Sequence, residues 1–302
     1  MGFREIRRTA EINMICKPRN KKTNNMKQTF KVLSVVAMTA GVLLASCKKD
    51  EDKNKPDNNE QVSPATMSFE VHGVPFTMVK VTGGTFQMGG TAEQGDDVTK
   101  YELPVHSVTL SDYYIGETEV TQALWRAVMG NNPSYYNKDS VNGESVFPVE
   151  HVTYLQCDTF FNKLSELTGK KFRFPTEAEW EFAARGGNKS NGYKYCGSNS
   201  IDSVAWYKEN SEHTTHPVKQ KKPNELGLYD MSGNVQEWCS DWRADYSDTA
   251  QVNPKGPEKG SYRIMRGGNW LYEATYCRVS KRYEDGQTHK YFINGLRLVM
   301  VP

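Results

Sequence analysis

The strongest candidate for metal chemistry is the segment from Asp230 to Glu237, in which two carboxylates bracket Gly233 and Val235. If this loop curls, the main-chain carbonyls of Gly233 and Val235 would face the same point as the carboxylates. Ligation by oxygen atoms alone suits a hard cation such as Ca²⁺. The alternative is a surface loop whose acidic side chains are only solvated. We predict one structural calcium ion, held by Asp230, Gly233, Val235 and Glu237, that stiffens the loop.

Cysteine is the second residue type that could do chemistry. The chain has six cysteines, and outside the cytoplasm the four that follow residue 150 could form disulfides with three connectivities that the sequence does not rank. Cys157 falls on an apolar helical stripe, so a small buried hydrophobe is its expected role. No histidine lies at a spacing from Cys277 that would indicate a nucleophilic pair. For Cys277 we favour a buried packing role.

The segment between Trp270 and Asn294 mixes tyrosines with small polar residues. Such residues make adaptable contacts at low entropic cost, as they do in binding loops. We predict a ligand-binding surface here, while a polar outer face with partly buried rings explains the pattern nearly as well. The candidate ligand-binding residues are Asn269, Trp270, Tyr272, Tyr276, Tyr283 and Tyr291.

Two further features of the C-terminal region concern the backbone. Gly267 and Gly268 stand just before Trp270 and mark a place where backbone passes close to backbone, because a Cβ could not be accommodated there. Arg278 and Arg297 are expected to anchor loops by donating hydrogen bonds to carbonyls and carboxylates.

The helices that position these segments are marked by capping boxes, in which a threonine precedes a glutamine or glutamate by three residues. Thr153 with Gln156 opens a helix with an apolar stripe that ends at Gly169. Thr176 with Glu179 opens a second helix, which the paired glycines at 186–187 terminate.

The predicted strands precede these helices. Apolar alternation from Phe76 to Gly89 predicts a hairpin, and 106–110 and 113–115 are two further strands. A short helix is expected to begin near Thr121. After Gly187 regular patterning fades, and turn-forming, aromatic and polar residues alternate to the end of the chain.

The front of the chain does not have the pattern of a folded core. A short basic stretch is followed by an apolar run from Val32 to Leu44. The run has the length of the apolar part of a signal peptide and is too short to span a membrane comfortably. Leu44 to Cys47 resembles a bacterial lipobox, which implies cleavage before Cys47 and a lipid on its thiol. The alternative is an ordinary cleaved signal. We predict an upstream extension over 1–25, a lipoprotein signal peptide over 26–46, a flexible tether over 47–67 and a globular domain over 68–302.

Charge narrows the choice of partners. The formal net charge of +2 owes much to the basic front, so the globular part is near neutral or acidic. The sequence lacks a basic stripe with interleaved aromatics, which argues against nucleic acid as a partner. It also lacks a Walker loop, a dinucleotide-binding glycine fingerprint and a serine elbow.

Five short motifs occur together in the globular part. They are Phe174–Glu181, Asn224–Met231, Gly233–Trp238, Arg266–Trp270 and Gly295–Arg297. In combination and order they resemble the sulfatase-modifying-factor family, also called formylglycine-generating enzymes, here in the setting of a Bacteroidetes-like bacterial lipoprotein. The resemblance implies an α+β, C-type-lectin-like fold that is rich in loops. It also implies a structural calcium site on the four residues already named.

The resemblance implies copper chemistry only in part. The family's oxidases hold copper between two cysteines five residues apart; the second matches Cys277, but the first falls on Tyr272. A phenol is a hard ligand with a pKa of about 10 and replaces a thiolate poorly. The family's active-site serine is Asn269 here, and its histidine is Glu273. Copper is therefore doubtful, and Cys277 is a catalytic residue only if the chain is active.

Together these observations predict a lipid-anchored lipoprotein of the outer membrane or cell surface. Its domain would be non-catalytic and would bind an unknown ligand or an envelope protein partner through the C-terminal loops. The alternative is a copper-dependent oxidase that converts a sulfatase cysteine to formylglycine, with Cys277 and an unrecognised second ligand.

Overall fold

The computed structural model describes residues 65–137 and 146–302. The expected extension (1–25), the signal peptide (26–46), the lipidated Cys47 and nearly all of the tether lie outside these residues. Strand β1 begins at Thr66, so the last two residues of the expected tether belong to the folded body. No helix within the described residues combines the length and the hydropathy needed to cross a membrane.

The three predicted helices are present. They are α2 (Gln122–Met129), α3 (Tyr154–Thr168) and α4 (Glu177–Ala184). The capping boxes of α3 and α4 are confirmed, since each N-cap threonine accepts a hydrogen bond from the third helical residue, whose side chain bonds back to the threonine N–H. Gly130 and Gly169 end α2 and α3 in the left-handed conformation. A single turn, α5, covers Ile201–Val204.

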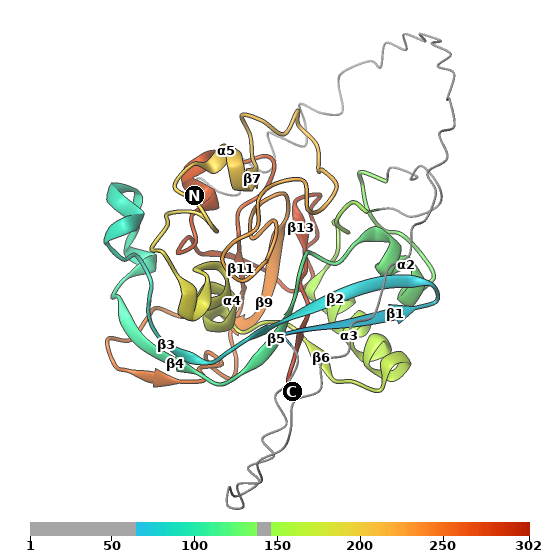
Figure 1. The fold of residues 1–302 in the computed structure, drawn as a ribbon, viewed down its shortest axis with the longest axis horizontal. Coiled ribbons are helices and arrows are strands. Elements are labelled where there is room, and N and C mark those ends of the chain that lie inside the picture. The colour runs from blue at the N-terminus through green and yellow to red at the C-terminus, as the bar shows by residue number, and fades with distance from the viewer. Residues whose placement is uncertain (1–64, 138–145) are drawn as a thin grey trace, which may run out of the picture. The chain divides into compact units, whose positions relative to one another are not determined.

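The largest sheet joins the two ends of the described body. Its order is β1 (Thr66–Val71), β2 (Val74–Val81), β5 (Tyr113–Gly116), β14 (Val299–Met300) and β6 (Phe172–Arg173), and every pair is antiparallel. The long β1–β2 ribbon, blue in Figure 1, lies beside α2 and α3. The last strand of the chain thus lies between β5 and β6.

The predicted hairpin over Phe76–Gly89 is wrong. Strand β2 pairs with β1 and β5, whereas β3 (Gly84–Met88) pairs with β4 (His106–Leu110) in a second sheet, which β10 (Gln251–Val252) completes. The chain crosses between the sheets at Gly83, where an added Cβ would overlap the backbone at Leu110 and Ser111. The alternating pattern identified two strands but could not say that they belong to different sheets.

A third sheet contains four strands of the C-terminal half. Its order is β12 (Tyr283–Asp285), β11 (Arg263–Arg266), β9 (Gln236–Trp242) and β13 (Asn294–Gly295). The short strands β7 (Ala205–Trp206) and β8 (Ser232–Gly233) pair beside it. Helix α4 packs against β9 and β11 and also against β3 and β4 (Figure 1). Short strands, few helices and long connections give the loop-rich α+β body that the sequence predicts.

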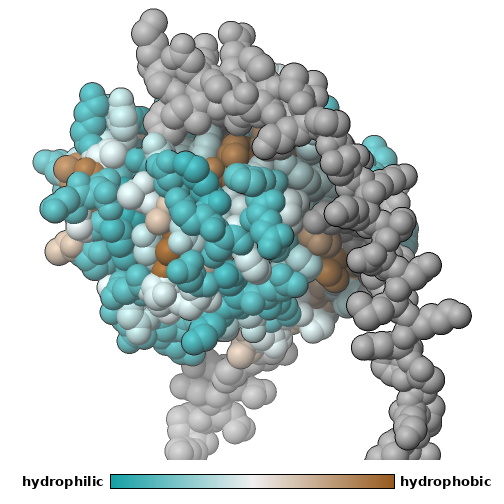
Figure 2. Space-filling view, turned by 90° about the horizontal axis from the view of Figure 1, so that it is seen from above, coloured by the Kyte–Doolittle hydropathy of each residue, from teal (hydrophilic) through white to brown (hydrophobic). Residues whose placement is uncertain are grey.

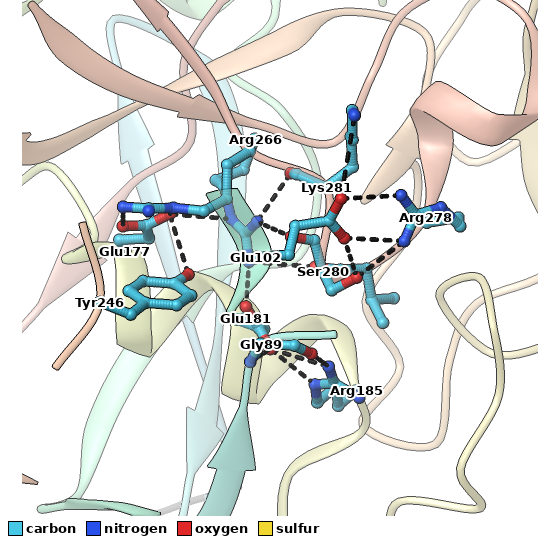
Figure 3. A network of polar contacts seen from close by, with 12 residues as sticks. Gly89, Glu102, Glu177, Glu181, Arg185, Tyr246, Arg266, Arg278, Ser280 and Lys281 are labelled. Carbon is cyan, nitrogen blue, oxygen red and sulfur yellow. Dashed lines mark hydrogen bonds and ion pairs between the residues drawn. The ribbon is translucent and has the colours of Figure 1, made fainter. Parts of the chain in front are cut away.

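Buried arginines hold the long loops in place. Arg278 donates to both carboxylate oxygens of Glu102, at 2.8 and 2.9 Å, and to the Asp97 carbonyl. Arg266 donates to Glu181 and to the carbonyls of residues 279–281, and Figure 3 shows that these contacts form one network around α4. A buried charge is tolerated when it is paired and fully hydrogen-bonded, so these loops are fixed without regular secondary structure. The anchoring role predicted for Arg278 is confirmed.

The face of the body seen in Figure 2 is mainly hydrophilic, and hydrophobic colour is confined to small separate patches. Scattered apolar residues of this kind are normal on a protein surface. The described part of this face therefore lacks a broad apolar patch, and a binding site on it would consist of particular side chains.

Candidate functional site

The first candidate site is the segment from Asp230 to Glu237, which contains β8 and runs into the start of β9. Asp230 has a positive φ of 58°, and its Oδ2 accepts a hydrogen bond from the Lys219 N–H at 2.8 Å. Its Oδ1 is buried and has no hydrogen-bond partner in the described residues. Burial raises the pKa of Asp230 to about 6. A buried carboxylate oxygen without a partner is the feature expected of a cation ligand.

Glu237, the other predicted carboxylate ligand, is already paired. Arg297 donates to both of its oxygens at 2.7–3.0 Å, and Trp180 Nε1 donates to Oε2 at 2.6 Å. Arg297 also donates to the carbonyls of Gly116 and Tyr229. This confirms the anchoring role that was predicted for Arg297.

A third carboxyl, Glu119, belongs to the same cluster and was missed by the sequence reasoning. Its oxygens accept from the Val235 N–H at 3.0 Å and from Asn234 Nδ2 at 2.8 Å. Burial, with the nearby charges of Asp230 and Glu237, raises its pKa well above the ordinary value. Glu119 lies more than a hundred residues earlier, with no motif around it to signal this role. We call Glu119, Asp230, Glu237 and Arg297 the acid cluster.

The acid cluster fits a calcium ion in part. The raised pKa of Glu119 favours its neutral form, which leaves Asp230 and Glu237 near the single guanidinium of Arg297. A cation would compensate the remaining excess of negative charge. Asp230 Oδ1 could ligate directly, and Gly233 and Val235 could offer carbonyls, while Glu237 would have to share its oxygens with Arg297. No group of three or more His, Cys, Asp or Glu side chains in the described ranges is arranged to hold a metal by itself. Main-chain carbonyls would therefore have to supply part of the ligand set.

The second candidate site is Cys277, at the end of a short 3-10 helix (Ala274–Cys277). The thiol is fully buried against Tyr195, Tyr207 and the small side chains at 204–205. Burial raises its pKa to about 12. Without a bound metal it is therefore a protonated thiol at neutral pH, and not a thiolate poised to attack a substrate. The other three described cysteines, Cys157, Cys196 and Cys239, are also buried free thiols.

The paired glycines explain how the chain passes Cys277. A Cβ on Gly268 would lie 2.7 Å from the Cys277 Sγ and 2.7 Å from the Tyr276 carbonyl oxygen. Both Gly267 and Gly268 also have positive φ angles, of 97° and 72°. The close backbone approach that was predicted from the sequence is confirmed.

Tyr272, at the position of the family's first cysteine, is part of an aromatic group. Its ring centroid lies 5.4 Å from that of Tyr276 and 6.2 Å from that of Tyr283. The Tyr283 hydroxyl donates to the Tyr276 carbonyl at 2.7 Å. We call these three residues the tyrosine cluster. The three rings pack against one another, so the Tyr272 ring fills the position of the family's first cysteine.

The predicted ligand-binding residues do not form one exposed surface. Asn269, Trp270, Tyr272 and Tyr283 are buried, and only Tyr276 and Tyr291 are partly exposed. Asn269 Oδ1 accepts from the N–H groups of residues 271 and 272, so it shapes the turn. The sequence overestimated exposure here because large aromatic side chains in a loop-rich fold supply much of its core.

The structure adds residues that the sequence reasoning missed. Trp270 packs near Tyr136 and Phe292, at centroid distances of 5.3 and 5.7 Å, and Tyr135 lies 5.6 Å from Phe292. We call Tyr135, Tyr136, Trp270 and Phe292 the aromatic patch. Tyr135 is its most exposed member, with 56% of its surface accessible. Because this tyrosine pair lies far from Trp270 in sequence, only the folded structure shows that they meet.

Short strands in small sheets, few helices and arginine-anchored loops define a loop-rich α+β domain, and comparison with known proteins identifies its class. Residues 63–301 match the family described as Sulfatase-modifying factor enzyme 1-like domain (FGE-sulfatase), and the chain belongs to that family. The family and the fold predicted from the five motifs are therefore confirmed.

Individual relatives have different names. "Chaperone protein LppX" of Paenibacillus barcinonensis is 35% identical over 253 residues, which cover 67% of this chain and 81% of that protein. The formylglycine-generating enzyme of Streptomyces coelicolor is 30% identical over 267 residues, which cover 68% of this chain and 82% of the enzyme. The family thus contains a protein named as a chaperone as well as named enzymes.

Two solved structures share the fold. Treponema denticola variable protein 1 superposes with a TM-score of 0.71 at 38% identity, over 80% of this chain and 100% of that one. PvdO from Pseudomonas aeruginosa gives a TM-score of 0.65 at 24% identity, over 80% of this chain and 99% of that one, which shows the fold alone.

Proposed function

We propose that this chain is a cell-envelope lipoprotein, anchored through a lipid on Cys47, whose FGE-sulfatase domain binds a ligand or a protein partner and does not oxidise cysteine. The binding surface is the aromatic patch together with the exposed edges of Tyr276 and Tyr291. The lipid would anchor the body at the outer membrane or cell surface, and its partner would be an envelope protein or a ligand that reaches the envelope.

The state of Cys277 is the observation that carries this proposal. Burial holds its pKa at about 12, and the neighbouring position that would need a second thiol is a tyrosine packed into the tyrosine cluster. Soft thiolates are the preferred ligands of Cu(I), and this site offers at most one of the two that are required, because Tyr272 supplies a phenol in place of the other. Cys277 is then a packing residue.

Two relatives support a binding role by their names. LppX is named as a chaperone, and the structure of Treponema denticola variable protein 1 is named for variability; neither name describes an oxidase. The similarity to the Streptomyces coelicolor formylglycine-generating enzyme supports the second candidate, a copper-dependent oxidase acting on a sulfatase cysteine.

Calcium would have a structural role in this proposal. Bound at Asp230 Oδ1 and the carbonyls of Gly233 and Val235, it would compensate the excess charge of the acid cluster and stiffen the loop that leads into β9. Glu119 would hold Val235 in place by accepting from its N–H, and Arg297 would hold Glu237, the fourth predicted ligand, by its hydrogen bonds.

Site-specific photo-crosslinking in intact cells tests the binding proposal. A benzophenone amino acid replaces either Tyr135 in the aromatic patch or Tyr101, which is 50% exposed and whose ring lies near Lys100 and Arg243. The two tyrosines have similar exposure, so general stickiness would give equal yields. We expect a defined adduct from position 135 and none from position 101. Equal adducts at both positions, or none at 135, would contradict the proposal.

A further inference from the structure

A cavity of about 560 Å³ is lined by none of the residues of the aromatic patch or the tyrosine cluster. It forms where the first turn of α4, the end of β9, the start of β4 and the loop over 244–257 meet. Its walls are partly apolar, with Met88, Trp242 and Pro254 among them. Its volume is within the range of small-molecule sites.

Two buried side chains that line this cavity, Asp241 and His106, each have one acceptor atom without a hydrogen bond in the described residues. Asp241 Oδ2 accepts from the Glu177 N–H at 2.9 Å and from Ser240 Oγ at 3.0 Å, while its Oδ1 has no hydrogen-bond partner among the described residues. Only 5% of Asp241 is exposed. Asp241 Oδ1 is not among the fully shielded polar atoms that lack a partner, so a molecule in the cavity can reach it.

His106 supplies the second acceptor. Its Nδ1 lies 3.1 Å from the Pro104 carbonyl oxygen, and since a carbonyl can only accept, Nδ1 carries the proton. In the neutral ring Nε2 is then an acceptor, and no hydrogen bond to it is formed within the described part of the chain. His106 is 4% exposed and packs against the Tyr246 ring at 4.7 Å.

Most of the cavity's other charges are already compensated. Arg282 pairs with Glu177 through two contacts of 2.7 Å. The Tyr246 hydroxyl also donates to Glu177, and Figure 3 shows these two residues side by side. At the rim Asp245 pairs with Arg243 at 2.8 Å, and Lys255 is exposed. Asp241 forms no ion pair in the described structure, and burial together with the charge of Glu177 raises its pKa to about 7. Asp241 and the exposed Lys255 are therefore the lining charges without an ion pair in the described structure, and of these two only Asp241 is buried. The buried part of the cavity offers acceptors but few free donors.

Gly256 keeps the free oxygen of Asp241 accessible. A Cβ at this position would lie 3.0 Å from the Asp241 Cβ and 3.2 Å from Oδ1. Because Gly256 has no side chain, the loop passes close to the Asp241 carboxylate and leaves Oδ1 uncovered.

We propose that this cavity is a binding site for a small organic cation, whose ammonium group donates hydrogen bonds to Asp241 Oδ1 and His106 Nε2 while its apolar part packs against Met88 and Trp242. An anion would face Asp241 and Glu177, and a neutral alcohol would satisfy the acceptors without compensating the charge. This inference does not depend on the proposed function, because none of the residues in that proposal lines the cavity.

Methyl NMR on protein with ¹³C-labelled methionine methyl groups tests the site directly. Met88 lines the cavity, and the Met88→Leu variant identifies its signal. The probe is phenethylammonium, with 2-phenylethanol as its neutral analogue and phenylacetate as its anionic analogue. We expect the Met88 signal to shift in a saturable way with the ammonium probe, at least tenfold more weakly with the alcohol, and not with phenylacetate. The signals of the buried Met231 and Met300 should stay in place.

The Asp241→Asn variant removes the charge and keeps an oxygen for the Glu177 and Ser240 hydrogen bonds. We expect it to weaken binding of phenethylammonium tenfold or more. Asp245→Asn, which removes a charge at the rim of the same cavity, is the matched control and should change affinity less than twofold. Equal binding of the three probes, no response of Met88 up to 10 mM phenethylammonium, or equal losses in the two variants would overturn the proposal. The comparison of probes uses the unmodified protein, so it decides the matter even if a variant fails to fold.

Discussion

The acid cluster and the Cys277 site differ in what surrounds their chemically active atoms. In the acid cluster three carboxyls face Arg297, and Asp230 keeps an oxygen without a partner. At the Cys277 site a single thiol is packed among tyrosines and small side chains. Both segments carry the family's sequence motifs, yet only the first retains a set of donors that could hold an ion. Two segments with family motifs can therefore differ in the ligand atoms that they offer, which are several oxygens in the acid cluster and one buried thiol at the Cys277 site.

The largest effect is expected from removing the cation of the acid cluster. Arg297→Ala leaves Glu237, Asp230 and Glu119 buried without a counter-charge, so it should lower the free energy of unfolding by about 3 to 5 kcal/mol. Urea denaturation measures this. Arg243→Ala is the control, because Arg243 pairs with the exposed Asp245 and Glu284 and should cost at most about 1 kcal/mol. Similar losses in both variants would show that the acid cluster is not a special electrostatic centre.

The Cys277 site should instead respond to changes in packing. Gly268→Ala places a methyl group against Cys277 Sγ at a positive φ, and we expect a loss of about 2 to 3 kcal/mol. Gly73→Ala has a similar φ of 82° but meets no atom within 4 Å, so it should show the backbone strain alone, about 1 kcal/mol. Thermal unfolding of both variants separates strain from overlap. Equal costs would mean that Cys277 is less tightly packed than described.

The pH dependence of stability distinguishes the two sites further. Burial raises the pKa of Asp230 to about 6, above the value of about 4 in the unfolded chain, so the folded state binds more protons between these values. The contribution of Asp230 to the free energy of unfolding is therefore fully present below about pH 4 and is lost as the pH rises through about 6. Relative to Asp230→Asn, the unmodified protein should lose about 1 to 2 kcal/mol across this window. Chemical denaturation at several pH values tests this.

Calcium should reverse that loss. If Asp230 is a ligand, millimolar calcium at pH 7 should raise the melting temperature of the unmodified protein and leave that of Asp230→Asn unchanged. Magnesium serves as the control ion, because it demands a smaller and more regular ligand shell. An equal response of both proteins to calcium would remove Asp230 from the ligand set.

The smallest effect is expected at the thiol itself. Cys277→Ala should cost about 1 kcal/mol, like any deletion of a small buried group. Cys157→Ala, at another fully buried cysteine on α3, is the matched control and should cost about the same. A much larger or smaller value for Cys277 would indicate that it does more than fill space.

Local signals allowed much of the fold to be predicted from the sequence. The capping boxes at Thr153 and Thr176 marked helix starts because their hydrogen bonds lie within four residues. The β2–β3 hairpin was wrong because strand pairing is decided by partners such as β5 and β4, which local alternation does not specify. The family motifs supplied the loop-rich architecture, which periodicity alone could not reveal.

The candidate sites were predictable only where their residues are close in sequence. Asp230 and Glu237 lie in one motif, whereas Glu119 joins them from more than a hundred residues away. Likewise, Trp270 meets Tyr136 only through folding, and the burial of Tyr272 and Tyr283 depends on rings that pack from elsewhere in the loop region. Asp241 and His106 carried no sequence signal, because an unused acceptor can be recognised only when all its neighbours are known.

The central claim is that Cys277 is a protonated packing thiol and not half of a copper site. Competition titration of Cu(I) against a chelator of known affinity, in the unmodified protein and in Cys277→Ser, tests it most directly. We expect the same weak affinity for Cu(I) in both proteins. We also expect that neither protein converts a cysteinyl peptide to its aldehyde in the presence of oxygen. Tight Cu(I) binding that Cys277→Ser abolishes, accompanied by aldehyde formation, would contradict it.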